Sequence, residues 1–503
     1  MPKPGMNLRA STSVLLAAAL TACAVGPDYH EPDAPDVKAY TGAPVAVTAV
    51  PVPGGSQTLH YGTLTSSEWW HDFHSDALDR VLQQALTNNP GLRQARENLS
   101  AAQYDYKAAN GVFYPQVGVG VGGQRARSSG AGPVVSHPSV YSLYTADVQV
   151  SYSPDIFGLS RLVSRRQQAL VDLADDQLQA ARLALVGNVI DVTLDLAATD
   201  EALDATRQSL ADEKQIYDLV KLRYDHGAIS RLVLDAQQTQ LSDVAAAAPA
   251  LEQQRDADLH LLAIYTGRFP AEGPGGDVPG FADLSLPADL PVTLPTDLVR
   301  ARPDIRAAEA QLRAANAEVG EAVARMYPQF TLTGDVGHES NQWGTLFKPA
   351  NEIWNLAANL FVPIFEGDTL EAEKESAEAQ YRGIFDQYQA TVLEAFRQVA
   401  DVLGALEHDA DVLSARVDQE ASAKEAFALA REQYKAGAIG YLDLLNSEVS
   451  YQSARIALVD ARQQRYADTA ALYVAMGGGA WTEAHETVPA AATTASPAAG
   501  TPD

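Results

Sequence analysis

Apolar side chains recur every seven residues along two long stretches of the chain. Those of the first stretch are Val189, Leu196, Leu203, Leu210, Tyr217 and Tyr224, and those of the second are Phe385, Val392, Val399, Leu406, Leu413, Phe427 and Tyr434, with Glu420 interrupting. A seven-residue repeat keeps one seam of a helix against a partner helix, as in coiled coils. Because neither stretch contains proline, the pattern predicts two very long helices. The first would run from Asp155 to Tyr224 and span about 105 Å at about 1.5 Å per residue.

Each long helix is followed by a glycine-containing turn and a second helical stretch. We expect the returning helices over Ser230 to Tyr265 and over Tyr441 to Met476, with a local kink at Pro249 in the first. Glycine suits a tight reversal between helices because it tolerates positive φ. The sequence therefore predicts two helical hairpins with tips near Gly227 and Gly437.

Four shorter stretches alternate between apolar and polar or small residues. They predict strands at about 113–124, 141–153, 327–338 and 353–363. An apolar face opposite a polar or small face is typical of a membrane barrel strand. Barrels made by a single chain need at least about eight strands, and four strands leave two unpaired edges. The barrel must therefore be shared between chains.

The chain contains one unit twice. Residues 434–445 match 224–235, residues 326–337 match 113–123, and residues 362–367 match 153–158. Matches at nearly the same offset indicate a duplication of about 210 residues. The helices that open the two units would span Asp76 to Asn110 and Thr296 to Arg325.

These elements predict how the chain is divided. The division comprises a cleaved signal peptide (1–22), a lipid-anchored arm with an equatorial segment (23–75), a first repeat (76–268), a linker with an equatorial segment (269–295), a second repeat (296–476) and a disordered tail (477–503). The linker is rich in Pro, Gly and Asp. The tail is dominated by Ala, Thr and Pro, which cannot build a core.

The N-terminus has the pattern of a secretory signal. Lys3 and Arg9 precede an apolar run that is too short to span a bilayer, and small residues precede Cys23, the only cysteine in the chain. The segment "LTAC" resembles the bacterial lipobox, which implies a diacylglycerol thioether on Cys23 and firm membrane anchoring. The alternative is an ordinary signal peptide that happens to contain cysteine. Ala24 stands where the inner-membrane retention rule wants Asp, which favours the outer membrane.

Composition and motifs exclude several classes of function. The formal net charge of −28 makes the chain a poor candidate for binding nucleic acid. Gly118, Gly120 and Gly123 match G-x-G-x-x-G but lie within an alternating strand, where a dinucleotide site needs a helix N-terminus. His71 and His74 have no evident further zinc ligands, and the adjacent aromatic residues are expected to pack against the helical body. No catalytic, metal or cofactor site is predicted, and the chain is not expected to be an enzyme.

The sequence resembles the TolC-like outer-membrane efflux factors, in the lipoprotein branch of the OprM/NodT type. The resemblance rests on "LTACAVGPDYHEP", "EWWHDF", "ALTNNPGLRQARENL", both Tyr-Pro-Gln turns, "VRARPDIRAAEAQLRAANAEVGEA" and the turns around Gly227 and Gly437. It implies a mainly α fold with a β-barrel, in which a homotrimer shares a twelve-strand barrel and a twelve-helix periplasmic barrel. It also implies a periplasmic adaptor and an inner-membrane pump of the RND type as partners, and outer-membrane lipid around the barrel.

The resemblance also assigns roles to residues at the hairpin tips. The expected adaptor contacts are Gly227, Ala228, Ile229, Gly437, Ala438 and Ile439, and the expected periplasmic gate is Leu442, Asp443 and Asn446. Three Asp443 carboxylates in a ring would filter charge. Some relatives have Asp where Asn446 stands and Arg where Ile439 stands, which argues against an Arg–Asp lock. The alternative, left open, is that Asp443 is a solvated acid beside the positive end of a helix dipole.

The sequence therefore predicts an outer-membrane channel subunit of a tripartite efflux system, lipid-anchored and with a large periplasmic extension. The alternatives are a type I secretion exit duct and a non-conducting periplasmic coiled-coil scaffold lipoprotein. A scaffold explains the seven-residue repeats but not four strands placed symmetrically in two halves. The cargo stays open among drugs, metals, phenolics and lipids.

Overall fold

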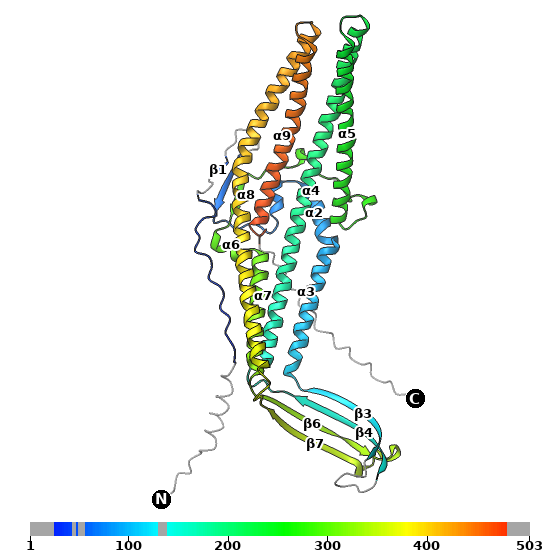
Figure 1. Cartoon of the computed structure of the whole chain (residues 1–503), viewed down its shortest axis with the longest axis vertical. Coiled ribbons are helices and arrows are strands. Elements are labelled where there is room, and N and C mark those ends of the chain that lie inside the picture. The colour runs from blue at the N-terminus through cyan, green and yellow to red at the C-terminus, as the bar shows by residue number, and fades with distance from the viewer. Residues whose placement is uncertain (1–24, 43–46, 49–55, 129–137, 480–503) are drawn as a thin grey trace, which may run out of the picture.

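Two helical hairpins and one sheet occupy opposite ends of an elongated molecule (Figure 1). The computed structural model describes residues 25–42, 47–48, 56–128 and 138–479. The expected signal peptide, Cys23 and nearly all of the expected tail lie outside these residues.

The long helices predicted from the seven-residue repeats are confirmed. Helices α4 (Leu159–Asp225) and α8 (Thr369–Lys435) each contain 67 residues, and the returning helices α5 (Arg231–Tyr265) and α9 (Tyr441–Ala475) each contain 35. Helix α5 continues through Pro249, and the kink expected there stays a prediction. In the part of the chain that the structure describes, no helix has both the length and the apolar character needed to cross a membrane.

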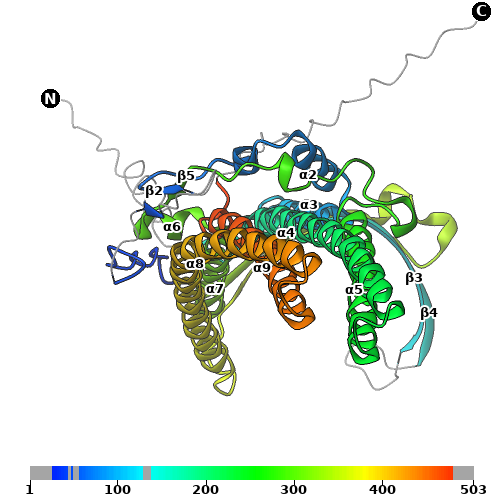
Figure 2. The same cartoon turned by 90° about the horizontal axis from the view of Figure 1, so that it is seen from above.

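The repeated apolar residues form the seams between helices. The members nearest the middle of the molecule are the most buried, and Val189 and Val399 have no exposed surface. Toward the first hairpin tip, Leu210, Tyr217 and Tyr224 are half-buried. Seen from above, α8, α9, α4 and α5 follow a curved row, with α2 (Asp76–Asn88) and α3 (Pro90–Ala109) on its convex side (Figure 2).

Each of the two shorter helices expected to open a repeat is in fact two helices. The first breaks at Asn89 between α2 and α3, and the second at Arg302 between α6 (Pro295–Ala301) and α7 (Pro303–Arg325). Both breaking residues precede a proline, which disfavours the α region at the residue before it. Their backbones are extended, with ψ of 124° and 125°. The Asn89 side chain accepts a hydrogen bond from the Leu92 amide at 3.0 Å and caps α3.

The four predicted strands form one antiparallel sheet in the order β3-β4-β6-β7. Their bounds are β3 Gln116–Ser128, β4 Ser139–Tyr152, β6 Gln329–Ser340 and β7 Glu352–Phe361. The first strand was expected to begin at 113, but a 3-10 turn occupies Asn110–Phe113 and delays it. The third begins two residues later than the expected 327 and ends at Ser340, while the second and fourth end short of 153 and 363.

One row of cross-strand neighbours is apolar across all four strands of the sheet. Val119 pairs with Val148, Val148 with Val336, and Val336 with Trp354. The exposed fractions along this row are 77%, 39%, 51% and 75%. An apolar row across the whole width of a sheet needs an apolar environment. Within the described residues, β3 and β7 have a neighbour on one side only.

A small equatorial sheet ties the N-terminal segment to the linker between the repeats. Its order is β1-β2-β5, with β1 at Val47–Thr48, β2 at Gln57–Tyr61 and β5 at Asp289–Val292. The linker expected at 269–295 thus contains a strand. The extended arm before it is held by hydrogen bonds from the Val25 amide to the Phe157 carbonyl at 3.3 Å and from the Tyr40 hydroxyl to the Thr293 carbonyl at 2.8 Å.

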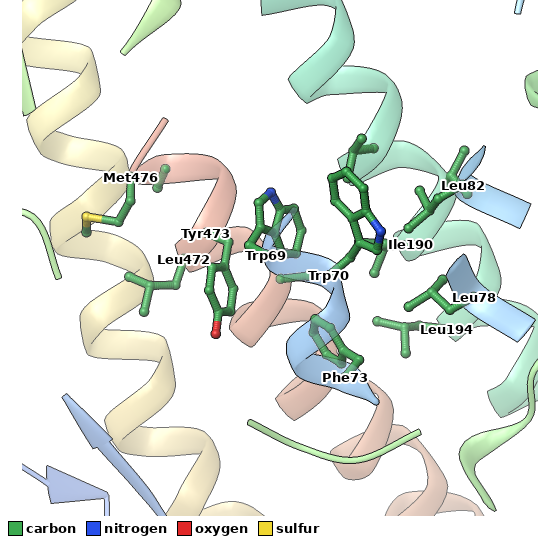
Figure 3. Close-up of a cluster of buried hydrophobic side chains, with 14 of the residues drawn as sticks. Trp69, Trp70, Phe73, Leu78, Leu82, Ile190, Leu194, Leu472, Tyr473 and Met476 are labelled. Carbon is green, nitrogen blue, oxygen red and sulfur yellow. The ribbon is translucent and has the colours of Figure 1, made fainter. Parts of the chain in front are cut away.

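An aromatic cluster fills the centre of the molecule, where α2, α4 and α9 meet (Figure 3). Trp69 and Phe73 have no exposed surface, and the Trp69 ring stacks on Tyr473 with centroids 4.8 Å apart. The prediction that these aromatic residues pack against the helical body is confirmed. Large buried side chains of this kind each contribute roughly 1.5–3 kcal/mol through burial.

Replacing Trp69 with alanine should lower the free energy of unfolding by about 3–5 kcal/mol, because it opens a cavity among three helices. Thermal unfolding of the detergent-extracted protein measures the loss. The matched control is Trp343→Ala, since Trp343 is 58% exposed and should shift the transition far less. Equal shifts for both variants would contradict the assignment of Trp69 to the core.

Candidate functional site

Both hairpin tips are built by the same backbone turn. Gly227 and Gly437 have φ of +70° and +72°. In the first tip the Ala228 amide donates to the Arg223 carbonyl at 2.9 Å, and in the second the Ala438 amide donates to the Gln433 carbonyl at 2.9 Å. This pattern, with glycine in the left-handed region, satisfies the last carbonyls of the incoming helix. At each tip the backbone therefore reverses its direction within a few residues.

The six predicted tip residues divide into an exposed and a packed group. Gly227, Ala228, Gly437 and Ala438 are exposed, whereas Ile229 and Ile439 are half-buried. The two isoleucines pack against a tip cluster that joins the two hairpins. The tip cluster consists of Ile216, Val220, Phe427, Tyr434, Tyr441 and Leu444.

The three predicted gate residues lie together on one exposed face at the start of α9. Leu442 is 68% exposed, and Asp443 and Asn446 are also exposed. The Asp443 carboxylate accepts a hydrogen bond from the Gly440 amide at 3.2 Å and so caps α9. The acid at the helix start is therefore part of the helix cap. A role in gating stays a prediction.

Arg223 connects the two hairpins and was not singled out from the sequence. Its guanidinium lies 4.2 Å from the centre of the Tyr434 ring and donates to the Tyr434 carbonyl at 2.7 Å and the Lys435 carbonyl at 3.2 Å. An arginine of α4 thus satisfies the carbonyls at the end of α8, where a helix dipole attracts positive charge. From the sequence, a basic residue in the last turn of α4 would be expected to cap α4 itself. Arg223 instead caps α8, which ends 212 residues later in the chain.

Two glutamates on different hairpins are buried next to the tip cluster. Glu213 of α4 is 0% exposed and Glu448 of α9 is 1% exposed. The Gln237 side-chain amide donates to Glu213. Among the described residues no amide, hydroxyl or cationic group donates to either carboxylate oxygen of Glu448, whose neighbour at hydrogen-bond range is the Glu213 carboxyl group. Burial and the nearby Glu213 carboxylate raise the pKa of Glu448 to about 9, and burial also raises the pKa of Glu213. Acids on long helices are mostly solvated, so no pattern in the sequence distinguishes these two from the others.

The remaining predicted features lie away from the tips. Gly118, Gly120 and Gly123 lie inside β3, which pairs with β4 along its whole length. His71 contacts Asp79 at 2.8 Å, and His74 contacts the Asp72 carbonyl at 2.7 Å. The described residues contain no group of three or more His, Cys, Asp or Glu side chains arranged to hold a metal ion.

Comparison with known proteins gives a consistent result. The family model described as "Outer membrane efflux protein" matches residues 81–268 and 294–478. The chain is 30% identical to the outer membrane protein OprJ of Pseudomonas aeruginosa over 495 residues, covering 97% of this chain and 98% of OprJ. It is 29% identical to the toluene efflux pump outer membrane protein TtgC of Pseudomonas putida, covering 94% and 96%. Its fold is similar to that of the outer-membrane channel OprN, with a TM-score of 0.82, 25% identity and coverage of 91% and 99%.

Replacing Arg223 with alanine should loosen the end of α8, because two of its last carbonyls lose a charged donor. Such a bond contributes about 1.5–3 kcal/mol when shielded and less at this partly exposed position. We expect residues near 434 and 435 to exchange amide hydrogen several-fold faster, measured by mass spectrometry. Arg231→Ala is the control, since Arg231 forms its ion pair with Asp235 of its own helix, at 3.3 Å. Unchanged exchange in Arg223→Ala would contradict the capping role.

Proposed function

The chain belongs to the outer membrane efflux protein family, and we propose that three copies form a duct that exports small molecules across the periplasm and the outer membrane. It is an outer-membrane efflux channel subunit, as its relatives are. In the proposed system an inner-membrane pump of the RND type passes cargo to the duct through a periplasmic adaptor. The chain itself conducts cargo and carries out no chemistry.

The sheet carries this proposal. Its apolar row is exposed, and its outer strands β3 and β7 each have one free edge among the described residues. In lipid, backbone groups at a free edge have no water to bond to, so they must pair with another strand. Copies of the same chain supply such a strand when β7 of one copy lies beside β3 of the next. The resemblance to the TolC-like factors supports three as the number of copies.

The curved row of helices supports the same assembly. Helices α8, α9, α4 and α5 lie along an arc (Figure 2), and three such arcs complete a tube of twelve helices. The hairpin tips then form the periplasmic mouth. Leu442, Asp443 and Asn446 of each copy would line that mouth, with Gly227, Ala228, Ile229, Gly437, Ala438 and Ile439 as the contacts for the adaptor. A threefold ring of Asp443 carboxylates favours cations over anions.

The N-terminal arm supports the proposed lipid anchor at Cys23. The Val25 amide is bound to the Phe157 carbonyl, at the junction between the sheet and α4. Two residues of chain reach at most about 7 Å. Acyl chains on Cys23 would therefore enter the membrane beside the periplasmic end of the sheet, in the same leaflet that this end of the proposed barrel contacts.

Single-channel conductance in a planar bilayer tests the duct. Purified protein should form discrete pores, and Asp443→Ala should reduce the preference for cations because it removes three carboxylates from one ring. Asp235→Ala is the control, since Asp235 of the first hairpin pairs with Arg231. Folded trimers that form no pores, even after deletion of the tip residues 437–440, would contradict conduction.

The lipid anchor has its own test. Cys23→Ser should abolish incorporation of labelled palmitate, because no other cysteine is present. Trimers of this variant should still require detergent for extraction, since the sheet remains embedded. Labelled palmitate on the serine variant would contradict the assignment of Cys23.

A further inference from the structure

The carboxyl pair, Glu213 and Glu448, joins the two hairpins at a buried position. Glu213 belongs to α4 and Glu448 to α9, which are the helices through which the hairpins pack on each other. With exposed fractions of 0% and 1%, both side chains are shielded from bulk water where the hairpins pack together. Burial of an unpaired carboxylate is strongly unfavourable, so two that face each other cannot both remain charged.

The groups around the carboxyl pair do not neutralise it. Helix α5 contributes Gln237 and Gln240, α8 contributes Arg431 and Tyr434, and α9 contributes Tyr441 and Gln452. Asp212 of α4 adds a further negative charge, and Arg431 makes its ion pair with Asp212, at 3.8 Å.

Two buried hydroxyls close to the pair have no partner of their own. Among the described residues, the Tyr434 and Tyr441 hydroxyls form no hydrogen bond, and these side chains are 3% and 8% exposed. Both carboxylates lie near enough to Tyr441 to raise its pKa, after the larger effect of burial. The surroundings thus hold donors for one anionic carboxylate, and the cation that lies near Glu448, Arg431, is paired with Asp212. A proton shared between Glu213 and Glu448 resolves this imbalance, because it makes one carboxyl a donor to the other.

We propose that Glu213 and Glu448 share a proton that holds the two hairpins of one chain together, and that loss of this proton releases the second hairpin from the first near the periplasmic mouth. The same helix, α9, carries Leu442, Asp443 and Asn446 at its first turns. Release of α9 at Glu448 therefore changes the position of the predicted gate residues. The device exists once per chain, because the residues equivalent to Glu213 and Glu448 in the other repeat are Ala423 and Gln238.

The direction of the pH dependence follows from proton linkage. An acid whose pKa is raised in the packed state binds more protons there than in the opened state, where its pKa is about 4.3. The shared proton contributes its full stabilisation to hairpin packing below the pKa of the opened state. This stabilisation is lost as the pH rises through the pKa of the packed state. Between these values the equilibrium constant for opening should rise up to about tenfold for each pH unit.

Hydrogen exchange of the full-length trimer in detergent tests the proposal. The rate of amide exchange near residues 213 and 448 is measured between about pH 5 and pH 10, a range that brackets both protonation states of the pair. Each rate is divided by the exchange rate of α7, and this ratio corrects for the pH dependence of intrinsic exchange. In the wild type the ratio should rise with pH. In Glu448→Gln, whose amide replaces the shared proton as the donor, the ratio should stay flat. The matched control is Glu407→Gln on α8, since Glu407 is exposed and should keep the wild-type response.

Two results would overturn the proposal. One is a wild-type ratio that does not change with pH, and the other is a Glu448→Gln protein that keeps the wild-type response. If Glu448→Gln yields no trimer, Glu213→Gln gives the same readout from the other side of the pair. The measurement does not depend on conduction, so failure of the proton device and failure of the duct can be told apart.

Discussion

The apolar seam of α4 is the constraint on which the rest of the structure depends. A helix of 67 residues is about 100 Å long, far longer than any one partner, so its seam must be covered in stages. Helices α3 and α7 cover it on the sheet side, α2 covers the middle, and α5 and α9 cover the part toward the tips. The aromatic cluster around Trp69 lies where these partners change over. The positions of both hairpins, and hence of the tips, follow from this succession of contacts.

Local patterns predicted most of this architecture, and long-range contacts supplied the rest. The seven-residue repeats and the alternating patterns were sufficient for α4, α8 and the four strands, because each pattern lies in one continuous stretch. The pairing of β4 with β6, which joins the two repeats, could not be read from such stretches. The breaks at Asn89 and Arg302 follow a local rule about proline, yet helical composition on both sides concealed them. Arg223 and the carboxyl pair could not be predicted, since each depends on a partner more than 200 residues away. The gate residues were named through resemblance, and the structure adds that they share an exposed face and that Asp443 caps α9.

The two repeats have the same architecture but different chemistry at their tips. Their long helices have equal lengths, as do their returning helices. At the start of α9, however, Asp443 caps the helix, whereas Val233 is the equivalent residue in α5. Arg223 likewise has Gln433 as its counterpart. These differences lie where the hairpins meet, so the two repeats share one scaffold while each contributes its own polar groups to the contact between them.

The outer edges of β3 and β7, which have no neighbouring strand among the described residues, have a consequence for the biogenesis of the proposed trimer. Before its neighbours arrive, a newly exported chain presents two strand edges and an apolar row to water, which is the surface on which chains aggregate. Assembly of the proposed three-copy duct depends on concentration, so the lifetime of this exposed species would grow as the supply of chains falls. For the proposed trimer, a holding chaperone that shields the sheet during transit, or delivery of the chains in quick succession to one insertion site, would limit this aggregation. The protein's yield is thereby set by the rate of encounter as well as by the stability of the finished assembly.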